Sequence, residues 1–75
     1  MTLEEMNAGQ SGTIVEVEGG HGLTHRLSSM GIRAGKAITK VSAMLMRGPV
    51  TVKIGNSQIA LGHGMAKKIH IEIEA

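Results

Sequence analysis

Glycine and proline interrupt this chain so often that long regular elements are excluded, and this feature constrains the fold more than any other. Eleven glycines and one proline occur among the 75 residues. They recur roughly every eight to twelve residues, a spacing typical of short strands joined by turns. The length predicts a single domain over residues 1–75, with one small core.

Five segments between these breaks have the patterning of β-strands. They are residues 13–18, 36–43, 49–54, 57–61 and 69–73. In the third segment, Val50, Val52 and Ile54 share one face, and Gly55-Asn56 then provides a two-residue reversal into the fourth. In the last segment, isoleucines alternate strictly with polar residues, which is the clearest strand pattern in the chain.

One segment breaks the strand pattern and predicts a short helix over residues 23–30. Leu23, Leu27 and Met30 have the i, i+4, i+7 spacing of one helical face, and Gly31 follows where a left-handed cap would lie. A helix this short is unstable alone, so its apolar face is expected to pack on the strands. A second, shorter helical turn is expected at residues 65–68.

Five short strands with one helix inserted after the first predict a mainly β fold, a small and partly open barrel. Closing the sheet suits a chain of this size because it hides strand edges and encloses one core. A flat sheet with the helix packed on one face is the competing architecture.

The composition excludes several functions. Without Phe, Trp or Tyr, the chain cannot form the aromatic grooves that read proline-rich peptides or the platforms that stack single-stranded nucleic acid. It also lacks Cys and Asp, and no nucleophile has an oriented base with an acidic partner. We therefore expect neither an enzyme nor a nucleic-acid-binding module.

Two features bear on location. No apolar run approaches the ~20 residues that cross a bilayer, so direct membrane insertion is not expected. The first six residues, Met-Thr-Leu-Glu-Glu-Met, are acidic where a secretory signal would be basic. A cytoplasmic location is the resulting expectation.

The histidines raise the question of a metal. The sequence Gly-His-Gly occurs at residues 20–22 and 62–64, where a sharp turn from strand to helix is favoured over an anion site. His21 and His25 lie four residues apart, so on a helix they would share a face and could bind a divalent transition metal weakly. No nearby carboxylate or thiolate completes a ligand shell. No cofactor is predicted, and a metal-binding regulator that uses His21 and His25 is the alternative function.

The segment 43–49 predicts a surface for binding a partner protein. It joins two strands and carries Met44, Leu45 and Met46, followed by Arg47. Flexible methionines suit adaptable interfaces, and arginine is a frequent anchor. The alternative is that these apolar side chains cap the open end of the barrel.

The distribution of charge favours an acidic partner. Between Gly19 and Ile71 lie all eight Lys and Arg residues and all four histidines, with no carboxylate. A basic section of this kind steers an acidic surface toward the protein. Arg26 and Arg33 project away from the apolar face of the predicted helix and are candidate contacts, with simple solvation as the alternative. The oligomeric state stays open.

The order of short motifs resembles the FeoA family. The residues that carry the resemblance are Gly9-Gln10-Ser11-Gly12-Thr13-Ile14, Gly19-Gly20, Leu23, Arg26-Leu27-Ser28-Ser29-Met30-Gly31-Ile32 and Gly35. The resemblance covers nearly the whole chain. It implies an SH3-like small barrel that acts in the cytoplasm as an accessory of the ferrous-iron transporter FeoB, by binding the cytoplasmic, GTPase-bearing part of that transporter.

Overall fold

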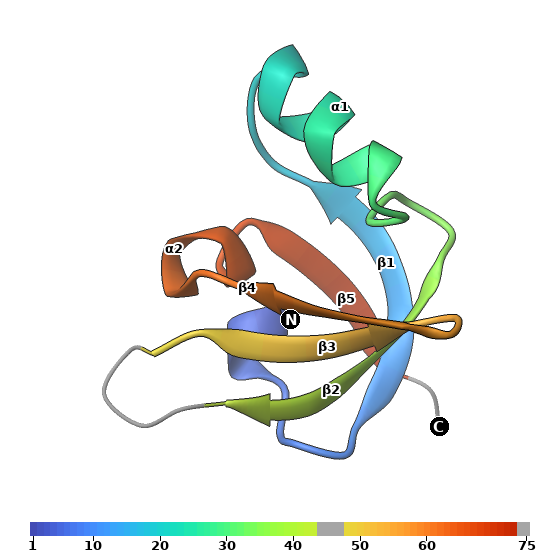
Figure 1. Cartoon of the computed structure of the whole chain (residues 1–75), viewed down its shortest axis with the longest axis vertical. Coiled ribbons are helices and arrows are strands. Elements are labelled where there is room, and N and C mark those ends of the chain that lie inside the picture. The colour runs from blue at the N-terminus through green and yellow to red at the C-terminus, as the bar shows by residue number, and fades with distance from the viewer. Residues whose placement is uncertain (44–47, 74–75) are drawn as a thin grey trace.

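The computed structural model describes residues 1–43 and 48–73. Its elements in chain order are η1 (Leu3–Glu5), β1 (Ser11–Val17), α1 (His21–Ser29), β2 (Ala37–Ala43), β3 (Val50–Ile54), β4 (Ser57–Leu61), α2 (His63–Ala66) and β5 (Ile69–Ile73). The strands form one antiparallel sheet in the order β4-β3-β2-β1-β5 (Figure 1). The predicted contact residues Met44, Leu45, Met46 and Arg47 lie outside the described residues.

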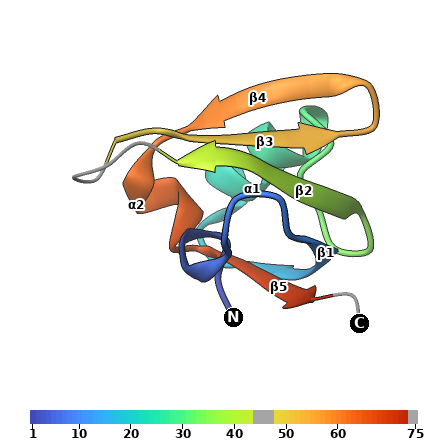
Figure 2. The same cartoon turned by 90° about the horizontal axis from the view of Figure 1, so that it is seen from below.

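The sheet curls back on itself, as the predicted mainly β barrel requires. Figure 2 shows β2, β3 and β4 as one layer and β1 and β5 as a second layer. The pairing shifts by one residue in β1, between Ile14 and Glu16, and again in β2, between Lys40 and Ser42. Such β-bulges bend a strand and increase its twist. The partly open barrel is therefore confirmed, and the flat sheet is not.

Strand β1 begins at Ser11, two residues earlier than predicted, because Gly12 belongs to the strand. A Cβ atom on Gly12 would stand 2.5 Å from the carbonyl oxygen of Glu72 and 2.6 Å from the Ile71 side chain. Glycine here allows β5 to approach closely instead of ending the strand. The other four strands lie within one residue of their predicted bounds.

Helix α1 begins at His21, two residues before the predicted start, and its end has the predicted glycine cap. Gly31 has a φ of 90°, and its N–H donates to the Ser28 carbonyl at 3.0 Å. The N–H of Ile32 donates to the Leu27 carbonyl at 2.9 Å, and both of these side chains are buried. This is a Schellman motif, which satisfies the last carbonyls of the helix.

The second helix, α2, was predicted two residues too late. It begins directly after Gly62, just as α1 begins directly after Gly20. Both Gly-His-Gly segments are therefore turns from a strand into a helix. The helix occupies this place because Ala66 packs fully buried in the core, a position that the pattern of polar residues around it did not reveal.

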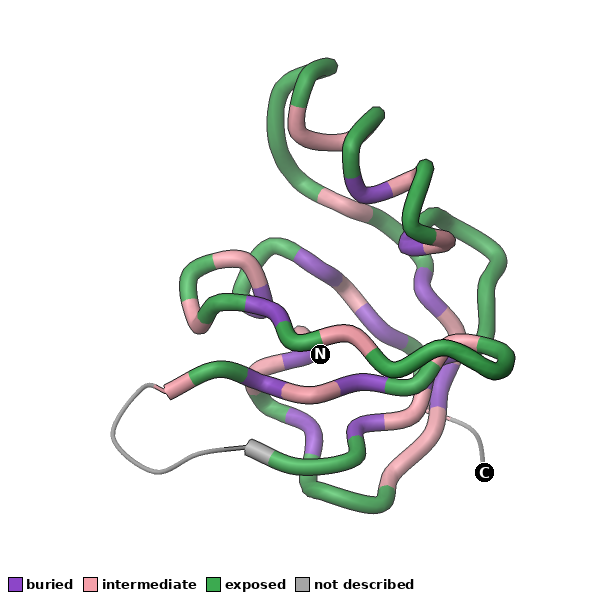
Figure 3. Tube along the Cα trace, in the orientation of Figure 1, coloured by how far each residue is buried: buried purple, intermediate pink, exposed green. Residues whose placement is uncertain are grey.

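Every strand and helix contributes at least one buried residue to the core, and Figure 3 marks these positions along the chain. Its buried apolar residues are Leu3, Met6, Ile14, Leu27, Ile32, Ile38, Val50, Val52, Leu61, Ala66, Ile69 and Ile71. Of the predicted helical face, Leu27 is buried, Leu23 packs partly buried against the core, and Met30 is 39% exposed. Met30 is the C-cap residue of α1, where the chain leaves the helix.

The 3₁₀ helix η1 at the N-terminus was not predicted from the sequence. Leu3 is fully buried, and the Glu5 carboxylate accepts a hydrogen bond from the Thr2 backbone N–H at 2.7 Å. That bond lowers the pKa of Glu5 from its ordinary value. A threonine followed three residues later by glutamate is the pattern of a capping box, so the sequence did contain a signal for this turn.

Candidate functional site

An open groove runs beside α1, between this helix, the end of β1 and the segment 32–34. Its volume is about 700 Å³. Three segments contribute its lining residues, which are Val17, His21, Gly22, Thr24, His25, Ser28, Ile32, Arg33 and Ala34. We refer to it as the α1 groove. The volume is that of a ligand cleft, but the open form suits a segment of another macromolecule better than an enclosed small molecule.

A tight glycine turn places the first wall of the α1 groove. Gly19 has a φ of 138°, which favours glycine, and a Cβ atom there would stand 2.8 Å from the Leu23 side chain. The chain therefore reverses between β1 and α1 within a few residues. As a result, His21 and His25, one helical turn apart, both line the groove that starts at Val17.

Backbone hydrogen bonds fix the second wall, which carries Arg33. The N–H of Gly35 donates to the Ile14 carbonyl at 2.7 Å, and the N–H of Ile14 donates to the Lys36 carbonyl at 2.9 Å. On its other side, Arg33 follows the Schellman motif of α1. Because the chain is held on both sides of Arg33, its backbone loses little conformational freedom when a partner binds, and only the exposed side chain has to be ordered.

The α1 groove is cationic. Arg33 carries a permanent positive charge, and none of the lining residues is acidic. Two glutamates flank the lining residue Val17: Glu16 is exposed, and the Glu18 carboxylate lies 3.1 Å from Nε2 of His70 on β5. The groove therefore complements a negatively charged surface.

The predicted contact residues do not form one surface within the described part of the chain. Arg33 lines the α1 groove, whereas Arg26 is exposed in the last turn of α1 and does not line it. Ala43 and Val50, which pair where β2 ends and β3 begins, precede and follow the predicted methionine segment. In the antiparallel β1–β2 pair, Ala43 lies beyond Ser11, whereas α1 follows the opposite end of β1 (Figure 1).

The histidines do not assemble a complete metal site. His21 and His25 share α1, as the alternative function requires, but the described residues contain no group of three His, Cys, Asp or Glu side chains that could hold a metal ion. His63 is directed to Glu4, with 3.8 Å between Nε2 and Oε1, and His70 is directed to Glu18. The α1 groove therefore offers two imidazoles from protein and leaves the other ligand positions to water or a partner.

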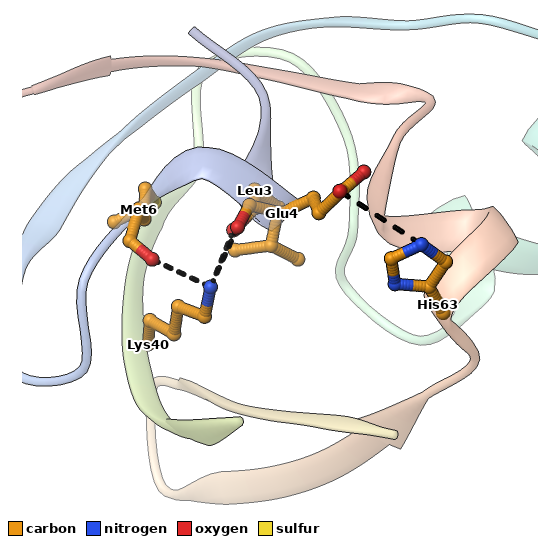
Figure 4. A network of polar contacts seen from close by, with 5 residues as sticks. All are labelled: Leu3, Glu4, Met6, Lys40 and His63. Carbon is orange, nitrogen blue, oxygen red and sulfur yellow. Dashed lines mark hydrogen bonds and ion pairs between the residues drawn. The ribbon is translucent and has the colours of Figure 1, made fainter. Parts of the chain in front are cut away.

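One basic residue of the middle section is unavailable to any partner. Lys40 is buried, and its ammonium donates to three backbone carbonyls, those of Leu3 at 3.1 Å, Glu4 at 3.0 Å and Met6 at 2.5 Å (Figure 4). Burial lowers the pKa of Lys40, and the nearby Glu4 carboxylate opposes that shift. Lys40 therefore attaches η1 to β2 and has a structural role.

Within residues 1–43 and 48–73, no helix is long and apolar enough to span a bilayer.

A five-stranded antiparallel barrel with one helix inserted after its first strand defines this chain as a small SH3-like domain. Residues 1–73 match the sequence profile of the FeoA domain. The chain belongs to the FeoA family, as the order of its motifs indicated.

Two curated relatives have informative names. The chain is 36% identical over 73 residues to a Porphyromonas gingivalis protein named Fe(2+) transport protein A/Fe(2+) transporter FeoB fusion protein, which covers 97% of this chain. It is 34% identical over 64 residues to a protein of Methanocaldococcus jannaschii named putative Fe(2+) transport protein A, covering 85% of this chain. The chain spans 9% of the length of the fusion protein and 76% of the archaeal one.

Solved structures share the fold over almost the whole chain. An iron uptake regulatory protein (FeoA) is 31% identical with a TM-score of 0.91, covering 99% of this chain and 97% of that one. FeoA of Stenotrophomonas maltophilia, described as a procaryotic SH3 domain protein complexed with zinc, is 26% identical with a TM-score of 0.82. That match covers 96% of this chain and 89% of the other.

Proposed function

We propose that this chain is a cytoplasmic, non-enzymatic accessory protein of ferrous iron transport that binds the cytoplasmic, GTPase-bearing part of a FeoB-type transporter. The P. gingivalis relative supports this proposal, because its name describes a fusion of Fe(2+) transport protein A with the transporter FeoB in one chain. Domains that act on one another are efficiently held together in one polypeptide, since a covalent link raises their effective concentration.

The cationic α1 groove is the observation that carries the binding proposal. It presents Arg33 on a fixed backbone beside His21 and His25, with no acidic lining residue. An acidic segment of the transporter's cytoplasmic region would be steered to this groove and held there by charge-assisted hydrogen bonds to the guanidinium. Arg26, exposed on the same helix, adds to the attraction over a longer range.

Met44, Leu45, Met46 and Arg47 remain part of the proposal as a second contact. The three apolar side chains suit an adaptable interface, and arginine is a frequent anchor. Substitutions in this segment and in the α1 groove test the two contacts separately.

The test measures binding of the purified soluble cytoplasmic region of a FeoB-type transporter by isothermal titration calorimetry. Arg33→Glu is expected to weaken binding at least tenfold, because it replaces the anchoring cation by a negative charge that repels the acidic partner. Lys67→Glu makes the same charge change at the exposed end of α2 and is the matched control, expected to change affinity less than twofold. Raising the salt concentration should weaken binding by the native chain and reduce the difference in affinity between the native chain and Arg33→Glu.

Each outcome has a defined meaning. Equal losses for Arg33→Glu and Lys67→Glu would show that only net charge matters and would reject the α1 groove as the contact. A loss confined to the double variant Met44→Asp/Leu45→Asp would move the contact to the methionine segment. No binding by the native chain would reject the proposed function.

Transition-metal binding through His21 and His25 is the second candidate function, and their placement one turn apart in α1 favours it. The zinc complex described for the S. maltophilia FeoA adds support. We expect a Zn²⁺ or Fe²⁺ titration of the native chain to show weak binding that is lost in His21→Gln/His25→Gln and kept in the control His63→Gln. Equal affinity of the native chain and the double variant would refute this candidate.

A further inference from the structure

The two edges of the sheet are not equally protected. The outer edge of β5 is partly covered by the N-terminal residues, since Thr2 forms a bridge with His70 and the Ile71 N–H donates to the Met1 carbonyl at 2.6 Å. The other edge is β4, residues Ser57–Leu61, which pairs only with β3. None of the described residues covers the outer side of β4 by backbone pairing (Figure 2).

The β4 edge lacks the features that usually prevent strands from pairing with it. Its sequence, Ser-Gln-Ile-Ala-Leu, contains no charge and no proline, and its five pairs with β3 continue without a bulge. Natural sheets protect an exposed edge with charged residues, proline, a bulge or a covering segment. An edge without these features is suited to accept another strand.

The register of the hairpin identifies the backbone groups that are available. Gly55 and Asn56 form a two-residue turn, so Ile54 and Ser57 form the closing hydrogen-bonded pair of the β3–β4 ladder. Alternate residues of an edge strand point their N–H and C=O groups outward. In β4 these residues are Gln58 and Ala60, and both are exposed.

We infer that the β4 edge binds an extended acidic segment of the partner as an additional strand, with Gln58 and Ala60 supplying the backbone hydrogen bonds. Charge argues for the acidic occupant. The exposed Lys53 of β3 pairs with Gln58 of β4. None of the described glutamates belongs to β3 or β4, since they lie in η1, in β1, directly after β1 and in β5.

This inference rests on the proposed function, because it describes a second contact with the same region of the transporter. Backbone pairing provides affinity that depends little on side chains, and Lys53 on the neighbouring strand then selects acidic sequences. The inference also explains why β4 is the least charged strand of the sheet. A charge on its edge would raise the cost of removing water from the backbone groups that must pair.

Hydrogen exchange provides the direct test, using the native chain with and without the soluble cytoplasmic region of a FeoB-type transporter. The amides of Gln58 and Ala60 should exchange at least tenfold more slowly in the complex. Those of Ile59 and Leu61, already bonded within the ladder, should change little. Unchanged exchange at Gln58 and Ala60 in a formed complex would overturn the inference.

Two substitutions provide an independent test. Ala60→Pro removes an outward N–H that the β3–β4 ladder does not use, so circular dichroism should remain native-like while affinity falls at least fivefold. Ala60→Ser is the matched control and should bind as the native chain does. Lys53→Glu should weaken binding several-fold, in contrast to Lys67→Glu.

The outcomes separate this inference from the proposed function. If Ala60→Pro binds normally while Arg33→Glu does not, strand addition is wrong and docking in the α1 groove stands. If β4 instead pairs with a second copy of the chain, sedimentation of the protein alone will show a dimer that Ala60→Pro abolishes, and the inference of an acidic peptide strand is overturned. If no variant changes binding, both proposals fail.

Discussion

Replacing Lys40 by methionine tests whether the buried ammonium holds the N-terminal residues on the barrel. Methionine has a similar length but no donor, so the carbonyl of Met6 would remain buried without a partner, and that of Leu3 would keep only the 3.3 Å bond from the Met6 N–H. Each buried acceptor left unpaired costs about 1–3 kcal/mol. Relief from burying a charge offsets part of this cost, and we expect a net loss of about 2 kcal/mol. In a domain of this size, that loss lowers the Tm by roughly 8–16 °C.

Urea unfolding followed by circular dichroism measures this change, with Lys53→Met as the control at an exposed lysine of β3. The free energy of unfolding of the control should differ from that of the native chain by less than about 0.5 kcal/mol. In Lys40→Met, the amides of Glu5 and Met6 should also lose protection from hydrogen exchange before the rest of the barrel does. A Lys40→Met variant as stable as the native chain, with these amides still protected, would refute the view that the ammonium secures η1.

The sign of the pH dependence follows from the lowered pKa of Lys40. Between that pKa and the ordinary lysine value of about 10.4, the unfolded chain binds more protons than the folded chain. The free energy of unfolding of the native chain should therefore rise as the pH rises through this window. Lys40→Met lacks the titrating group, so this rise should be absent from it, and an identical rise in both proteins would contradict the assignment.

Three smaller changes test other parts of the fold. Gly12→Ala should destabilise the barrel by about 1–3 kcal/mol in urea unfolding, because the new Cβ meets the Glu72 carbonyl; an unchanged midpoint would show that β5 can move away. Gly22→Ala should instead raise the free energy of unfolding by about 0.5–1 kcal/mol, because alanine favours the helix and a Cβ there meets no atom within 4 Å. A lower stability of this variant would show that the new methyl group clashes. The pKa of Glu5, measured by NMR titration, should lie below the ordinary value of about 4.3 because the Thr2 N–H favours the carboxylate, and an unshifted midpoint would contradict that bond.

Much of the fold could be predicted because local signals agree with the tertiary structure. The isoleucines of β5 and the valines of β3 alternate with polar residues without interruption. Neither strand contains a bulge, because the extra residues lie in their partners β1 and β2. The Gly55-Asn56 turn and the Gly31 cap lie where the sequence places them, and both glycines have positive φ values. These features depend on a few neighbouring residues, so a sequence pattern is sufficient to find them.

The α1 groove could not be predicted, because it forms only when three neighbouring segments within residues 17–34 turn against one another. Arg33 and the two histidines were candidates for different reasons, one as an isolated cation and the others as a metal pair. Only the Gly19 turn and the hydrogen bonds between Ile14 and the segment after Arg33 bring them to the same groove. The free edge of β4 was hidden for the same reason, since strand order is not a property of any one segment.

The irregular patterns of β1 and β2 have a single physical cause. In β2, Ile38 and Lys40 are buried, and the next residue, Val41, is the extra residue of a bulge and is 39% exposed. In β1, the bulge places Val15 in the solvent at 49% exposure directly after the buried Ile14. Each bulge reverses the alternation of the residues that follow it, so the sequence appears to lack a polar face. Lys40 precedes the second bulge and lies on the buried face with Ile38, where it holds η1, and β1 ends after the first bulge at Val17, where the α1 groove begins.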